Sequence, residues 1–204
     1  MLRTRLLLLG GLAASIGLAQ TATLDTLEIT KNRGRFELVA ETYLDAPAAE
    51  IHAVLLEYDD NLFARISGVY KESRYLDPAA DGTPIIYTRM EGCILFYCKS
   101  MRRTERLESR PPLFIRTETL PEDSDFEYSH SEWILEPEGA GTRMKYVLVM
   151  DPKFWVPPVI GPWFIKQAVS TGGLRAVERI ERMARGEPLP RRGIGRGERR
   201  RDDD

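Results

Sequence analysis

The strongest constraint on this chain is a run of six segments with a two-residue hydrophobic period between residues 69 and 150. Apolar and polar side chains alternate along each segment, which is typical of half-buried β-strands. Turn-forming sequences such as DPAADG, SRPP, PEDSD and EPEGAG separate most of them. Because the links are short, the pattern predicts six antiparallel strands in a meander. The six segments are 69–76, 84–93, 98–108, 113–120, 126–135 and 142–150.

Other elements flank the meander on both sides. Residues 27–44 alternate as one or two strands, and Asp45 and Pro47 then favour the start of a short helix. Residues 62–66 predict a second short helix. After the meander, apolar residues recur at helical spacing within 161–185. The predicted fold class is therefore α+β, with a curved antiparallel sheet wrapped around a long C-terminal helix and two short helices after the first strand.

The ends of the chain differ from this predicted domain, which covers residues 27–185. Residues 1–19 have a positive start, a short apolar run and small residues before a plausible cleavage point, as in a secretory signal peptide. We expect a periplasmic or secreted protein; the alternative is a protein anchored by the uncleaved segment. Residues 186–204 are rich in charge and glycine and are expected to be disordered.

Export changes the interpretation of the two cysteines, because disulfides persist in oxidising compartments. In one extended strand, Cys93 and Cys98 would lie about 16 Å apart, which is too far to bridge. A turn at residues 94–97 places them opposite each other across a hairpin, so we predict that they pair. A turn at residues 91–92 is the alternative, and it would leave the thiols apart.

Three stretches resemble the START-like superfamily of polyketide cyclases, dehydrases and lipid transport proteins (SRPBCC), which includes coenzyme Q-binding START-type domains. They are LDAPAAEIHAVLLEYDD, SEWILEPEGAGTRMKYVLVMDP and PPVIGPWFIKQAVSTGGLRAVERIERMA, and the resemblance covers residues 35–184. It implies a helix-grip fold with a hydrophobic cavity between sheet and helix that holds lipids, quinones or polyketides. It carries no catalytic signature, and a fold alone does not decide function.

The expected function is therefore an exported binding protein or carrier for an apolar or amphipathic small molecule. Arg89 and Glu91 share one face of a strand and would orient a ligand head group, or else form a solvated outer face. The complete set of predicted ligand-binding residues is Tyr87, Arg89, Glu91, Trp133, Tyr146, Trp163 and Gln167.

The alternative function is a cyclase-like or hydrolytic enzyme that uses His130 and Glu132 as an acid–base pair in the same cavity. The other histidine, His52, is expected to be a half-exposed surface residue on the first helix. The sequence contains no nucleophile elbow, phosphate-binding loop or metal-spaced cluster, so we expect no cofactor and no metal. The net charge of −2 gives no indication of nucleic-acid binding, and we expect a monomer.

Two apolar loops suggest a transient contact with a membrane or a lipid-bearing partner. In the predicted meander, the hairpin tip with Leu95 and Phe96 lies at the same end of the sheet as the loop with Phe154 and Trp155. Exposed apolar patches mark interaction sites, and aromatic residues suit the membrane interface. The alternative is that the two loops pack on each other as a closed lid.

Overall fold

The computed structural model describes residues 23–32, 34–94, 97–156 and 161–189, with the side chains at 23, 94, 97 and 161–171 left undescribed. The strands are β1 (Thr23–Asn32), β2 (Arg35–Leu44), β3 (Tyr70–Leu76), β4 (Ile85–Ile94), β5 (Tyr97–Arg110), β6 (Phe114–Thr119), β7 (Phe126–Glu138) and β8 (Gly141–Pro152). The helices are α1 (Ala48–Leu55), α2 (Gly161–Ala184) and the 3-10 turns η1 (Asp59–Asn61), η2 (Phe63–Arg65) and η3 (Pro121–Asp123).

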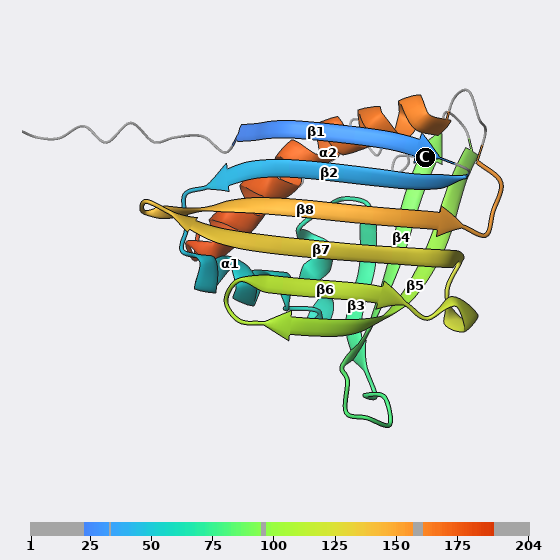
Figure 1. Cartoon of the computed structure of the whole chain (residues 1–204), viewed down its shortest axis with the longest axis horizontal. Helices are drawn as coiled ribbons and strands as arrows, with labels where there is room; N and C mark the ends of the chain where they lie inside the picture. The colour runs from blue at the N-terminus through green and yellow to red at the C-terminus, as the bar shows by residue number, and fades with distance from the viewer. Residues whose placement is uncertain (1–22, 33, 95–96, 157–160, 190–204) are drawn as a thin grey trace, which may run out of the picture.

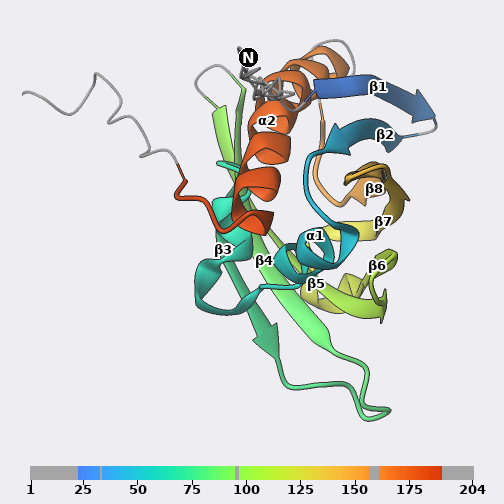
Figure 2. The ribbon, with the colours of Figure 1, turned by 90° about the vertical axis from the view of Figure 1, so that its left-hand side faces the viewer.

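All eight described strands form one antiparallel sheet in the order β1-β2-β8-β7-β6-β5-β4-β3 (Figure 1). The six strands of the predicted meander are present as β3 to β8, each hydrogen-bonded to the next. β2 pairs with β8, so the start of the chain extends the sheet beyond its last strand. The sheet curves around α1 and α2, which lie on its concave side (Figure 2).

The helical elements differ in detail from the sequence prediction. They follow two strands rather than one, and the predicted second short helix consists of 3-10 turns. α1 begins after Pro47, and no side chain caps its first turn. Asp45 does not cap α1, because its carboxylate contacts Arg185 Nη1 at 3.4 Å; its backbone N–H donates to the Glu181 carboxylate of α2 over 2.8 Å. This bond ties the end of α2 to the loop between β2 and α1.

The core lies between the concave face of the sheet and these helices. Ile51 and Leu55 of α1 and Val177 and Ile180 of α2 are buried. They pack in one cluster with sheet residues such as Leu135. The alternation of each strand thus separates a concave face toward the helices from an outer face toward solvent.

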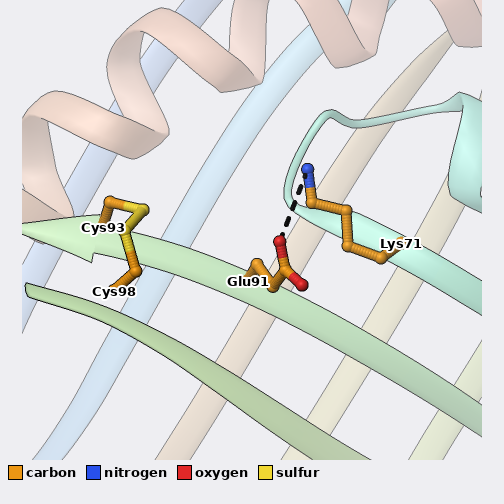
Figure 3. The surroundings of a disulfide bond; sticks show 4 residues. All are labelled: Lys71, Glu91, Cys93 and Cys98. Atoms are coloured by element: carbon orange, nitrogen blue, oxygen red, sulfur yellow. Dashed lines mark ion pairs between the residues drawn. A yellow bond between two sulfur atoms is a disulfide. The ribbon is translucent and has the colours of Figure 1, made fainter.

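The hairpin between β4 and β5 carries the disulfide. Cys93 and Cys98 are directly opposite in the register and are joined, as predicted from the need for a turn between them. Figure 3 shows the bond near the end of β4, with the Glu91–Lys71 ion pair (4.0 Å) beside it on the neighbouring strands.

The outer edge of β3 is occupied by side chains of the preceding turn η1. The Ser73 backbone N–H donates to Asn61 Oδ1 over 2.9 Å, and the Tyr75 N–H donates to Asp59 Oδ1 over 3.3 Å. Asp60 and Asn61 have positive φ angles of 51° and 59°, a conformation that Asp and Asn tolerate better than most residues.

Candidate functional site

A band of buried polar side chains crosses the concave face of the sheet from β3 to β7. Strand alternation directs these side chains toward the helices, and the register brings several of them side by side, such as Thr88 beside Arg103 and Thr117 beside Ser131. Each is at most 7% exposed. We call this set the polar band: Ser73, Thr88, Arg103, Glu105, Thr117, Thr119, Ser129 and Ser131.

An ion pair lies at the centre of the polar band. The side chains of Arg103 and Glu105 are 5% and 1% exposed, and Arg103 Nε lies 2.9 Å from Glu105 Oε2. Thr117 Oγ1 donates its single hydrogen to Glu105 Oε1 over 2.8 Å. The Ser131 hydroxyl lies 2.7 Å from Thr117 Oγ1, so in that bond Ser131 must be the donor. Arg103 Nη1 donates to Ser129 Oγ over 3.3 Å. The carboxylate and the guanidinium therefore each have a hydroxyl partner in addition to each other.

Two buried polar atoms of the band have no hydrogen-bond partner among the described residues: Arg103 Nε and Thr119 Oγ1. The short distance from Arg103 Nε to Glu105 is thus an ionic contact whose angle does not make a hydrogen bond. Because β6 lies between β5 and β7, the Arg103 side chain that reaches Ser129 crosses the strand that carries Thr119. Buried unsatisfied polar atoms are rare in native proteins, so two in one band call for an explanation.

Electrostatics keep the Arg103 side chain charged. Burial lowers the pKa of Arg103, but the negative charge of Glu105 outweighs burial and raises that pKa above its usual value. Burial raises the pKa of Tyr146, and it raises the pKa of Tyr58 well above the usual range. The tyrosines around the ion pair are therefore neutral at physiological pH.

Aromatic rings adjoin the polar band on the same face. The rings of Trp133 and Tyr146 lie 4.6 Å apart, and Phe63 meets Trp133 edge-on at 6.4 Å. Tyr58 stacks on Phe63 at 4.4 Å. The structure thus brings together two of the predicted ligand-binding residues, Trp133 and Tyr146. Two others, Trp163 and Gln167, lie on α2, but their side chains lie outside the described residues.

Tyr87, Arg89 and Glu91 lie on the outer face instead, because the alternate residues of β4 face the core. Arg89 pairs with Glu91 at 3.0 Å and with Glu72 at 3.3 Å, and all three side chains are at least one-third exposed. Arg74 covers the Tyr87 ring at 4.2 Å. This placement corresponds to the solvated alternative for the Arg89–Glu91 pair rather than to a ligand head-group site.

His130 and Glu132 also lie on the outer face, opposite Trp133 on β7. His130 Nε2 is 3.1 Å from Glu132 Oε1, and Arg116 donates to the same oxygen over 2.7 Å. Burial alone raises the pKa of Glu132, but the hydrogen bonds from Arg116 and His130 lower it below its usual value. The two residues are brought together, but away from the concave face where the enzymatic alternative requires them.

His52 is buried, contrary to the expectation of a half-exposed side chain. It is 5% exposed because its face of α1 packs against the β5–β6 hairpin. Its Nε2 atom lies 2.9 Å from Ser109 Oγ. Burial lowers the pKa of His52, and a hydrogen bond with the Phe114 backbone offsets part of that change.

The two apolar loops are described only in part. Trp155 is 77% exposed, and Lys99 near the start of β5 lies 5.4 Å from the centre of the Phe154 ring. The start of β5 therefore lies beside the loop after β8, as strand parity predicted. Leu95 and Phe96 at the hairpin tip lie outside the described residues.

The cavity predicted between sheet and α2 involves side chains 161–171, which lie outside the described residues. The described part of the chain does form a depression of about 370 Å³, but on the outer face. It is lined by Thr30, Asn32, Arg35, Glu37, Val149 and Asp151. Among the described residues, no group of His, Cys, Asp or Glu side chains is arranged to hold a metal ion.

Sequence reasoning missed the polar band. Arg103 and Glu105 lie in a predicted strand, and the charged residues Arg102 and Arg106 flank them in the sequence RRTERLE, so no alternation of apolar and charged residues marks one face. The available signal was the recurrence of Ser and Thr at alternate positions of neighbouring strands, as at Ser129 and Ser131. Combined with the strand register, that recurrence indicates a shared polar face.

Solved structures of other proteins have a similar fold. No family model and no curated protein sequence matches the chain. A STAR-related lipid transfer protein from Xanthomonas axonopodis is similar in structure, with a TM-score of 0.57, 18% identity, and coverage of 78% of this chain and 99% of that one. A START superfamily protein from Mycobacterium smegmatis has a TM-score of 0.56 at 17% identity, covering 72% and 98% of the two chains.

An enzyme is also among the similar structures. The Zhui aromatase/cyclase from Streptomyces sp. R1128 has a TM-score of 0.52 at 16% identity, covering 72% of this chain and 94% of the enzyme. These likenesses show that the chain has the START-like (SRPBCC) helix-grip fold, as its sequence resemblance predicted. At such identities they concern the fold alone.

Proposed function

We propose that this chain is a binding protein or carrier that holds an apolar or amphipathic small molecule between the concave face of the sheet and α2. The observation that carries the proposal is the polar band, with its two unsatisfied buried atoms, beside the rings of Trp133 and Tyr146. Ligand sites typically combine apolar walls with a few precisely placed polar groups. The names of the similar proteins, a lipid transfer protein and an aromatase/cyclase, support a small-molecule site on this fold.

Stability alone does not account for the ion pair of Arg103 and Glu105. Replacing a buried ion pair by apolar residues of similar volume is often neutral or stabilising, because both charges must be removed from water. A buried pair that leaves one N–H, at Arg103 Nε, outside hydrogen-bond geometry therefore supports a partner that is not part of the chain.

The enzymatic alternative has less support. It requires His130 and Glu132 in the same cavity as the ligand, whereas both side chains lie on the outer face, where Glu132 pairs with Arg116 and contacts His130. A carrier function needs no acid–base pair on the concave face, so the binding function remains the proposal.

We further propose that the protein acts outside the cytoplasm. The signal-like residues 1–19 support export, and the Cys93–Cys98 disulfide suits an oxidising compartment. Membrane anchoring through the uncleaved N-terminal segment is the alternative. Within the described ranges, no helix is long and apolar enough to cross a bilayer. Mass spectrometry of the protein from the native host distinguishes a cleaved N-terminus near residue 20 from an intact one.

Ligand exchange at a membrane surface is part of the same proposal. The exposed Trp155 and the adjacent Phe154 offer aromatic surface at one end of the sheet. Removal of residues 1–19, which contain Arg3 and Arg5 and no acidic residue, changes the net charge from −2 to −4, so this contact is expected to be weak and nearly independent of salt. Liposome co-sedimentation compares wild type with a Phe96→Ser, Trp155→Ser double variant; equal, negligible binding by both would remove the membrane contact from the proposal.

The binding function is tested with the neutral dye Nile red and with organic extracts of the natively purified protein. We expect a saturable rise in Nile red fluorescence and a co-purifying hydrophobic compound. Tyr146→Ala removes ring area beside Trp133 and is expected to weaken dye binding about tenfold. The matched control is Tyr87→Ala on the outer face, which should leave it unchanged. Absence of saturable binding and of any extracted compound contradicts the proposal.

A further inference from the structure

We propose that the polar band selects ligands whose head group is an uncharged oxygen, such as an alcohol or a ketone, and discriminates against carboxylates. This inference rests on the proposed binding function, and it specifies the class of ligand. It is carried by the balance of charge within the band and by the two unsatisfied atoms, Arg103 Nε and Thr119 Oγ1.

The unsatisfied atoms define the hydrogen bonds that a ligand can make. Arg103 Nε carries a hydrogen and can only donate, whereas the Thr119 hydroxyl can donate or accept. A carbonyl oxygen accepts from either atom, and an alcohol oxygen can also donate to Thr119. Both atoms belong to side chains that are at most 7% exposed, so the group that satisfies them must enter the concave face.

Charge balance separates neutral head groups from anionic ones. Arg103 and Glu105 face each other at 2.9 Å, and the remaining members of the band are hydroxyl residues. The nearby tyrosines, Tyr58 and Tyr146, are neutral. The band therefore has no net charge. A carboxylate that binds Arg103 would bring a second negative charge close to Glu105 in a site shielded from water, where like charges repel strongly.

The same balance predicts how the preference can be inverted. Glu105→Gln removes the compensating charge and leaves the Arg103 guanidinium without an anionic partner. A ligand carboxylate then supplies the missing negative charge, and Arg–carboxylate hydrogen bonds are among the strong ones. The variant should therefore favour the class of ligand that the wild-type protein rejects.

The experiment measures displacement of Nile red by 1-decanol, 2-decanone and decanoate near pH 8, where decanoate is ionised. For wild type we expect the alcohol and the ketone to bind about tenfold more tightly than decanoate. Glu105→Gln should tighten decanoate binding about tenfold and weaken the preference for the neutral ligands. The matched control, Glu132→Gln, makes the same change on the outer face and should leave the order as in wild type.

A second variant covers the case in which Glu105→Gln does not fold. Arg103→Met combined with Glu105→Leu removes both charges, and it should still bind Nile red. It should still reject decanoate, because an apolar site offers an ionised carboxylate no partner, but it should bind the alcohol and the ketone more weakly, because the Arg103 donor is gone. If wild type binds decanoate as well as decanol, or if this double variant binds decanol and 2-decanone as tightly as wild type, the head-group inference is wrong and the two atoms are satisfied by water only. If Nile red does not bind at all, the proposed function itself fails.

Discussion

Removing one member of the Arg103–Glu105 pair should destabilise the protein far more than removing both. At an effective dielectric constant near 20, two unit charges 2.9 Å apart attract by roughly 6 kcal/mol. Desolvating two such ions costs several kcal/mol each, so the intact pair contributes little net stability. Arg103→Met or Glu105→Leu alone leaves the other charge buried and unpaired, and each should cost about 3–5 kcal/mol. The double variant should lie within about 1 kcal/mol of wild type.

Urea unfolding of wild type, the two single variants and the double variant, followed by fluorescence and circular dichroism, measures these differences. The comparison requires that the slope of the unfolding free energy against urea concentration is the same for all four proteins. The coupling energy of the cycle should then be at least about 5 kcal/mol, from the single and double costs above. A control cycle uses Glu41→Leu and Lys145→Met, which break a pair of nearly the same length, 3.0 Å, on the outer face. Because these side chains are 35% and 44% exposed, the control coupling should not exceed about 1 kcal/mol.

Two results would refute this reasoning. One is a single variant that loses less than about 1 kcal/mol, which would mean that the remaining charge reaches water. The other is a double variant as unstable as the sum of the single variants. That result would mean that the two side chains act through packing rather than through their charges.

Reducing the Cys93–Cys98 disulfide should lower the free energy of unfolding by about 2 kcal/mol, since the closed loop is short; two free thiols in peptide maps of the exported protein would contradict the pairing. Burial lowers the pKa of His52, so the unfolded chain binds its proton first, and stability should fall as the pH drops below 6.5. His52→Gln should flatten that dependence, and parallel urea midpoints for variant and wild type across this range would refute the assignment. Glu181→Ala removes the acceptor of a loop N–H and should cost about 1.5–3 kcal/mol in thermal or urea unfolding. Its control, Glu178→Ala on the exposed side of α2, should cost no more than about 0.5 kcal/mol; equal losses would count against the role of Glu181.

The fold was largely predictable because it depends on patterns that the sequence displays directly. Strand alternation and turn residues located β3 to β8, and helical spacing located α2. The cysteine pairing was predicted from an expected oxidising compartment and a turn at residues 94–97, with a turn at 91–92 as the alternative, and the structure has the bond. One error concerns the start of α1. Asp45 was assigned to cap this helix, but its carboxylate instead contacts Arg185, which is 140 residues away in the chain.

The candidate site was less predictable because it depends on which face of each strand turns inward. Trp133 was assigned correctly to the concave side, since large apolar side chains favour burial. Arg103 was not singled out, because charged side chains are rarely buried; its partner Glu105 makes its burial possible. His130 and Arg89 could not be assigned to either face, because polar residues occupy both faces of these strands. Their positions follow from the register of the whole sheet.

The side chains that occupy the edge of β3 have a consequence for association between molecules. An open sheet edge presents free N–H and C=O groups on which another chain can add a strand and begin to aggregate. A foreign strand that pairs with β3 would first have to displace the hydrogen bonds from Ser73 to Asn61 and from Tyr75 to Asp59. The left-handed backbone at Asp60 and Asn61, which is unfavourable by itself, places these two acceptors. These bonds are therefore expected to hinder the addition of a foreign strand at this edge of the sheet.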